Sequence, residues 1–127
     1  MSEFTDTSSK EEKIQNVEKR IRKEINRLRK LYKPLPENQF ALVEGLIVQA
    51  ARLRVRLDDL WTDIQENGET ELFSQSEKTE PYERRRPAAE LFTATDKNYQ
   101  AIIKLLDEKL PSSISSDKSR LGALRSK

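Results

Sequence analysis

The chain has 127 residues, of which 36% are charged and 35% are hydrophobic, and its formal net charge is +2. It contains no cysteine and no histidine, which excludes thiolate nucleophiles, disulfides, imidazole bases and the usual zinc sites. No apolar run approaches the roughly 20 residues that cross a membrane, and the start of the chain lacks the pattern of a signal peptide. We therefore expect one small soluble domain in the cytoplasm.

The first predicted element is an amphipathic helix over about residues 9–32, after a disordered lead at 1–8. A capping box of Ser8 with Glu11, or the serine–glutamate pair one residue later, begins it. The Lys-Pro-Leu-Pro sequence that follows ends it, because proline disfavours helix in the residue before it. Its apolar residues step by three or four and so form one stripe: Ile14, Val17, Ile21, Ile25, Leu28 and Leu31.

The other faces of this helix are strongly basic. Residues 10–33 hold ten lysines and arginines against four glutamates, which gives this segment a net charge of +6. Such a concentrated field suits a polyanion, most commonly a nucleic acid. The alternative is a solvated helix face whose long arginine stems shield apolar surface. The candidate DNA contacts are Lys19, Arg20, Lys23, Arg27 and Lys30.

Two further helices are predicted to form a long helical hairpin that supplies the core. The second covers about 36–66 and ends at Gly68, and the third begins at Pro87 and covers about 87–110. The prediction is an all-α fold with three principal helices in a single domain. The expected core or oligomer contacts are Phe40, Ile47, Leu57, Trp61, Ile64, Leu91, Tyr99, Ile102 and Leu106.

The segment between these two helices is acidic and ends in three arginines. At 69–80 a short β-hairpin and a loop are both compatible with the sequence. Arg84, Arg85 and Arg86 could clamp phosphate beside the start of the third helix, or could pair with the glutamates before them, and we favour pairing. Residues 111–127 are predicted to be a flexible basic tail.

No catalytic, cofactor or metal site is recognisable. The three glycines are isolated, so no phosphate-binding loop is present. Asp59, Asp63 and Glu66 share one helix face and could hold a hard cation. A salt-bridged surface is the favoured interpretation, because arginines lie one turn away. We predict that the chain is not an enzyme.

Arg52, Arg54 and Arg56 occupy alternate positions and fan over about 200° of the second helix. We interpret them as ion-pair donors, to Asp58 and Asp59 within the helix or to another subunit, and not as a DNA surface.

Three segments between residues 36 and 110 carry a family resemblance. They are Ala50–Ile64, with Leu-x-x-Leu-x-x-x-Ile closed by a glycine, then Arg86–Phe92 with a Pro-Ala helix start, then Asn98–Leu106 with its tyrosine. In this order and spacing they resemble the small terminase subunits of tailed bacteriophages, over about three fifths of the chain.

The resemblance implies a non-catalytic component of viral genome packaging. Such a subunit forms a homo-oligomer, expected to be a ring, and binds double-stranded DNA in the infected bacterial host. It presents that DNA to a large terminase subunit with ATPase and nuclease activity. The compact helix-turn-helix that many of these proteins use on DNA is not recognisable here, so the basic first helix is the candidate that replaces it.

The alternative function is a phage structural or adaptor protein, or an inhibitor of a host nuclease, that binds protein and not DNA. A metal-dependent enzyme using Asp59 and Asp63 is a third hypothesis.

Overall fold

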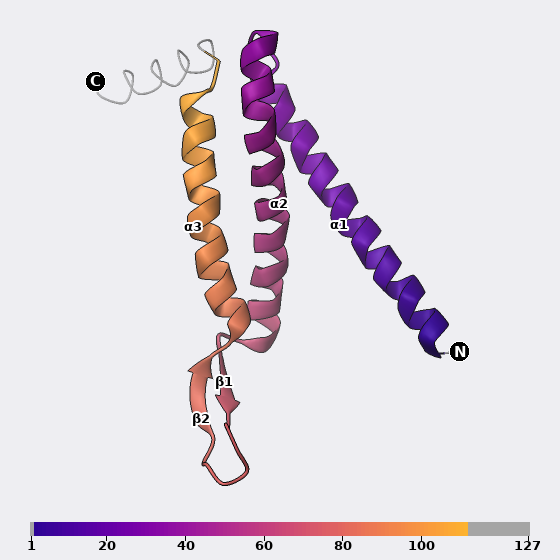
Figure 1. Cartoon of the computed structure of the whole chain (residues 1–127), viewed down its shortest axis with the longest axis vertical. Coiled ribbons are helices and arrows are strands. Elements are labelled where there is room, and N and C mark those ends of the chain that lie inside the picture. Colours follow the sequence, from indigo (N-terminus) through magenta and orange to yellow (C-terminus); the bar gives the residue numbers. More distant parts are fainter. Residues whose placement is uncertain (1, 112–127) are drawn as a thin grey trace, which may run out of the picture.

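Three long helices and one two-stranded hairpin make up the fold. The structure, a computed structural model, describes residues 2–111, and the side chains of residues 9–111. The elements follow in the order α1 (Ser2–Tyr32), α2 (Glu37–Asn67), β1 (Thr70–Phe73), β2 (Tyr82–Arg85) and α3 (Pro87–Glu108) (Figure 1). This confirms the predicted all-α fold with three principal helices. All but the first residue of the predicted tail lies outside the described residues.

α1 ends where the sequence predicts but begins earlier. It ends at Tyr32, before Pro34, and a turn follows in which the Leu35 amide donates to the Tyr32 carbonyl at 3.0 Å. The predicted start near residue 9 is wrong, because residues 2–8 already belong to the helix. No proline or glycine interrupts this segment, so nothing in the chain obliges the helix to begin at the capping box.

α2 and α3 run antiparallel as the predicted helical hairpin (Figure 1), and α1 packs along α2 from the turn that joins them as far as Asp59. Gly68 ends α2 with a φ of 83°, a left-handed conformation that favours glycine, and its amide donates to the Ile64 carbonyl at 2.7 Å. The core lies where the three helices meet, at the end where α1 joins α2. Its buried residues are Leu28, Tyr32, Val43, Ile47, Ala50 and Leu106.

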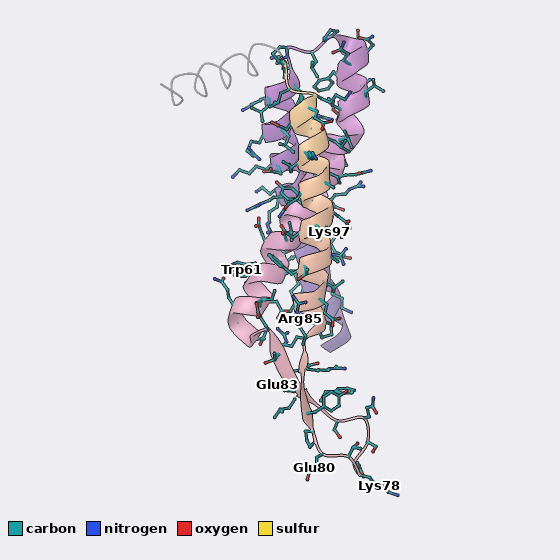
Figure 2. All side chains as sticks on the ribbon, turned by 90° about the vertical axis from the view of Figure 1, so that its left-hand side faces the viewer. Trp61, Lys78, Glu80, Glu83, Arg85 and Lys97 are labelled. Atoms are coloured by element: carbon teal, nitrogen blue, oxygen red, sulfur yellow. The ribbon has the colours of Figure 1, made fainter. Side chains whose placement is uncertain are left out.

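Seven of the nine predicted core or oligomer contacts are buried or half-buried within the chain, and for the other two an oligomer contact remains a prediction. The buried or half-buried members are Phe40, Ile47, Leu57, Ile64, Tyr99, Ile102 and Leu106. Trp61 and Leu91 are instead 47% and 44% exposed, and Trp61 projects from the side of α2 (Figure 2). An apolar stripe shows which face of a helix could be buried. Because α2 and α3 bury only the sides that face each other, Trp61 and Leu91 at the margins of their stripes stay exposed. The Trp61 ring lies beside Phe92, with the centroids 5.6 Å apart.

The apolar stripe of α1 is only partly buried. Leu28 is 6% exposed, whereas Ile14 is 58% exposed and Leu31 is 39% exposed. α1 leaves α2 at an angle, so its N-terminal half projects away from the other two helices (Figure 1). This half of α1 therefore presents both charged and apolar side chains to solvent.

β1 and β2 form an antiparallel hairpin that extends beyond the ends of α2 and α3 (Figure 1). The register pairs Glu71 with Arg84 and Phe73 with Tyr82. The second strand thus lies beyond the predicted limits of 69–80, because the arginine run is itself the partner strand. The two rings pack edge to face, with their centroids 5.9 Å apart, and the Arg84 guanidinium lies 3.5 Å from the centre of the Phe73 ring.

Candidate nucleic-acid interface

Ion pairs divide the candidate residues of α1 into two groups. Arg20 contacts Asp59 of α2 at 2.7 Å, and Arg27 contacts Glu24 of α1 at 2.6 Å. The others are exposed and have no ion pair with any side chain of residues 9–111: Lys19, Lys23 and Lys30. The charges of these three lysines are therefore free to meet an external anion.

Two ion pairs hold α1 against α2. One is Arg20 with Asp59, and the other joins Arg29 to Glu44 through both Nε and Nη2 of the guanidinium. The hydrogen bonds to Glu44 raise the pKa of Arg29 further above its ordinary value. Exposed pairs of this kind contribute little to stability one at a time. The partners lie 39 residues apart in the first pair and 15 apart in the second, so both pairs are contacts between helices and depend on how α1 is rotated on α2.

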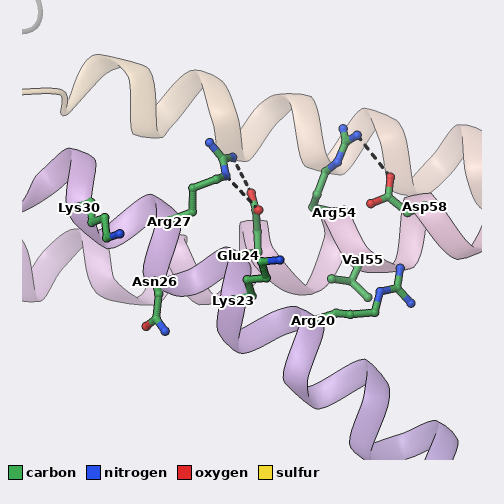
Figure 3. Close-up of a pocket in the computed structure, with 9 residues that line it drawn as sticks. All are labelled: Arg20, Lys23, Glu24, Asn26, Arg27, Lys30, Arg54, Val55 and Asp58. Atoms are coloured by element: carbon green, nitrogen blue, oxygen red, sulfur yellow. Dashed lines mark hydrogen bonds and ion pairs between the residues drawn. The ribbon is translucent and has the colours of Figure 1, made fainter.

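An open groove lies where α1 crosses α2, and Figure 3 shows the side chains that line it. Its volume is about 470 Å³, within the range of roughly 300–1,000 Å³ typical of ligand clefts. The structure brings four of the five α1 candidates into this groove, whereas Lys19 is not among its lining residues. The charged residues of the groove are five cations and two carboxylates: Arg20, Lys23, Arg27, Lys30 and Arg54, with Glu24 and Asp58.

Arg54 of α2 is the member of this groove that the sequence did not predict. Its interpretation as an intrahelical ion-pair donor is confirmed, because Nη2 lies 3.3 Å from the Asp58 carboxylate. The same guanidinium nevertheless lies over the Tyr99 ring, 5.9 Å from its centre, and lines the groove with the α1 lysines. The alternating arginines of the sequence do not indicate which one lines this groove, because the angle between α1 and α2 decides it.

The three arginines before α3 are all engaged within the chain. Arg84 contacts Glu71 at 2.7 Å, so the favoured pairing with a glutamate of the preceding segment is confirmed for this residue. Arg85 donates to the Ala89 carbonyl at 3.2 Å and to the Thr93 hydroxyl at 2.6 Å, both in α3.

Arg86 is the most enclosed of these three arginines. It contacts the Asp63 carboxylate of α2 at 3.1 Å and donates to the Gly68 carbonyl at 2.8 Å. It thereby joins the end of α2 to the start of α3. DNA contact by Arg84–Arg86 remains a prediction that these internal contacts do not favour.

Asp58, Asp59 and Asp63 of α2 each pair with an arginine of the chain. Asp59 pairs with Arg20, so the predicted pair between Arg56 and Asp59 is wrong. Hydrogen bonds from Asn67 and then from Arg86 lower the pKa of Asp63 below its usual range. Within the described part of the chain, no three potential metal ligands come together.

Comparison of the chain with protein-family models, curated proteins and solved structures finds no significant match. The resemblance to small terminase subunits therefore remains a prediction from the sequence. No helix within residues 2–111 combines the length and the apolar character that crossing a membrane requires.

Proposed function

We propose that this protein is a non-catalytic component of phage DNA packaging, similar to a small terminase subunit. In this proposal it assembles as a homo-oligomer, binds double-stranded DNA through α1, and presents the DNA to a large subunit that carries the ATPase and nuclease. The observation that carries the proposal is a set of exposed α1 lysines that form no ion pair with the described side chains: Lys19, Lys23 and Lys30.

The distribution of charge supports a polyanionic partner. The segment 10–33 has a net charge of +6, and its ion pairs to α2 hold it in one orientation. An unpaired ammonium group can replace a condensed counterion and release it without first leaving a carboxylate of the chain. The free lysines therefore supply the affinity, and the paired arginines supply the rigidity.

Exposed apolar residues on the helical hairpin support self-assembly. Leu42 is 77% exposed, and Trp61, Leu91 and Leu105 are each between 44% and 47% exposed. A contiguous apolar patch at the surface marks a contact with another chain, and the Trp61 ring lies beside Phe92, next to Leu91 in sequence. Assembly would place several copies of α1 on one particle, so that weak phosphate contacts add together.

The test measures how DNA affinity depends on salt for a variant with Lys19, Lys23 and Lys30 changed to glutamine. The logarithm of affinity falls with the logarithm of salt by about 0.9 for each phosphate neutralised, so the slope should decrease by about 3 for each chain that contacts DNA. The matched control changes three exposed lysines outside α1 to glutamine and should keep the slope: Lys78, Lys97 and Lys104 (Lys78 and Lys97 are labelled in Figure 2).

Two results would redirect the proposal. An unchanged slope in the α1 variant, with DNA still bound, would move the DNA contact to Arg84–Arg86 or to the tail. An intact chain that does not bind duplex DNA at about 50 mM salt would favour the alternative of an adaptor or nuclease inhibitor that binds protein.

A further inference from the structure

The groove between α1 and α2 presents two guanidinium groups from different helices on the same side. Figure 3 shows the side chains of Arg27 and Arg54 pointing the same way, each joined to a carboxylate of its own helix. The contact of Arg27 with Glu24 is 2.6 Å, whereas that of Arg54 with Asp58 is 3.3 Å. Arg54 is therefore the more loosely held of the two, although it lines the same groove.

The remaining cations of the groove leave it with excess positive charge. Lys23 and Lys30 line the groove and have no ion pair within the described side chains. With five cations against two carboxylates, the lining has a net charge of +3. Asp59, which does not line the groove, pairs with Arg20, so the excess that remains is carried by Lys23 and Lys30, and an external anion is the ligand that this charge favours.

We propose that this groove binds a phosphodiester of the DNA backbone between α1 and α2, with Lys23 and Lys30 on one side and Arg54 on the other. The proposal rests on the function proposed above and adds a contact from a second helix to it. Arg54 exchanges Asp58 for the phosphate, because the planar guanidinium can donate two parallel hydrogen bonds to phosphate oxygens. The exchange is easy, since an exposed ion pair at 3.3 Å contributes little.

The ion pairs that join α1 to α2 do not depend on the Arg54–Asp58 contact. Arg20 with Asp59, and Arg29 with Glu44, hold the two helices together without using Arg54. The spacing between Lys23 and Arg54 is therefore set before DNA arrives, which lowers the entropic cost of binding.

The experiment compares the full chain with its Arg54→Gln and Arg52→Gln variants in binding to one duplex, measured by fluorescence anisotropy over a range of salt concentrations. Both variants lose one exposed positive charge from α2, but Arg52 does not line this groove. Arg54→Gln should lower the salt slope by about 0.9 for each chain that contacts DNA, and Arg52→Gln should leave it unchanged. Asp58→Asn should raise the affinity, because it removes the carboxylate that competes with phosphate. Circular dichroism confirms that each variant keeps its helices.

The outcomes separate this proposal from the function on which it rests. Equal salt slopes for the Arg54→Gln and Arg52→Gln variants would show that the groove does not bind phosphate. If the triple lysine variant still had a reduced salt slope, the proposal that α1 binds DNA would stand. No DNA binding by the unmodified chain would overturn both. If Arg54→Gln weakened the binding of a polyglutamate peptide and left DNA binding unchanged, the groove would take an acidic peptide and the phosphodiester proposal would be wrong.

Discussion

Removing one hydroxyl group tests how α1 is joined to the rest of the core. Tyr32 is 3% exposed, and its hydroxyl donates a hydrogen bond of 2.6 Å to the carbonyl of Leu106, 74 residues away. Tyr32→Phe keeps the buried ring and deletes this bond. The Leu106 carbonyl would still accept from the Lys109 amide at 3.0 Å, so it would not be left without a partner. We therefore expect a loss of about 1 kcal/mol in the free energy of unfolding, the usual net value of one hydrogen bond.

Urea unfolding followed by circular dichroism measures this loss at one fixed chain concentration, because assembly makes stability depend on concentration. With a slope of about 1–3 kcal/mol/M, the midpoint should fall by roughly 0.3–1 M. Tyr82→Phe is the matched control, since Tyr82 is 49% exposed and its hydroxyl has no hydrogen bond within the described residues. A Tyr32→Phe variant as stable as the unmodified chain would refute this account of the core.

The unmodified chain and the Tyr32→Phe variant should also differ in how their stability depends on pH. Burial, and then the charge of Asp107, raise the pKa of Tyr32 above its ordinary value. Because the pKa is raised in the folded state, the contribution of the Tyr32 hydroxyl to the free energy of unfolding is complete below about pH 10, the pKa in the unfolded chain. This contribution is lost as the pH rises through the pKa of the folded state. The unmodified chain should therefore lose stability in strong alkali more steeply than the Tyr32→Phe variant does.

Two further predictions concern the end of the helical hairpin. Hydrogen bonds lower the pKa of Asp63, so the stabilisation by its carboxylate is present above about pH 4 and is lost as the pH falls through the pKa of the folded state. Asp63→Asn should therefore lower the free energy of unfolding at neutral pH, measured with urea. The difference in stability between the two chains should shrink in acid. Trp61→Ala should cost less than the roughly 3–5 kcal/mol of a fully buried aromatic, because the ring is 47% exposed, and should reduce the particle mass in light scattering. A loss of about 3–5 kcal/mol in the free energy of unfolding, with no change in the particle mass, would contradict the assignment of Trp61 to an assembly surface.

The ends of the helices could be predicted because they depend on local chemistry. Pro34 ends α1 at the preceding turn, Gly68 supplies the one positive φ of the described chain, and Pro87 occupies the first turn of α3. The buried positions of α2 follow from the 3.6-residue period in the same way. The start of α1 was misplaced because Ser8 and Glu11 match a capping box, whereas the helix continues through them to Ser2 and residues 2–8 contain no helix breaker.

The angle between α1 and α2 could not be predicted, and three differences from the prediction follow from it. The stripe of α1 continues to Ile14, but α1 leaves the bundle before that residue can pack. The same angle places Asp59 against Arg20 and not against Arg56, and it places Arg54 in the groove. These are contacts between helices, for which one sequence gives residue types but no distances.

The central claim is that an assembly of this chain binds double-stranded DNA. The most direct measurement is the mass, by light scattering, of the particle that forms on a short duplex at about 50 mM salt. We predict the mass of the duplex plus several chains, with the triple lysine variant of α1 leaving the DNA free at higher salt. A duplex that remains alone, or that carries a single chain at tens of micromolar protein, would contradict the claim.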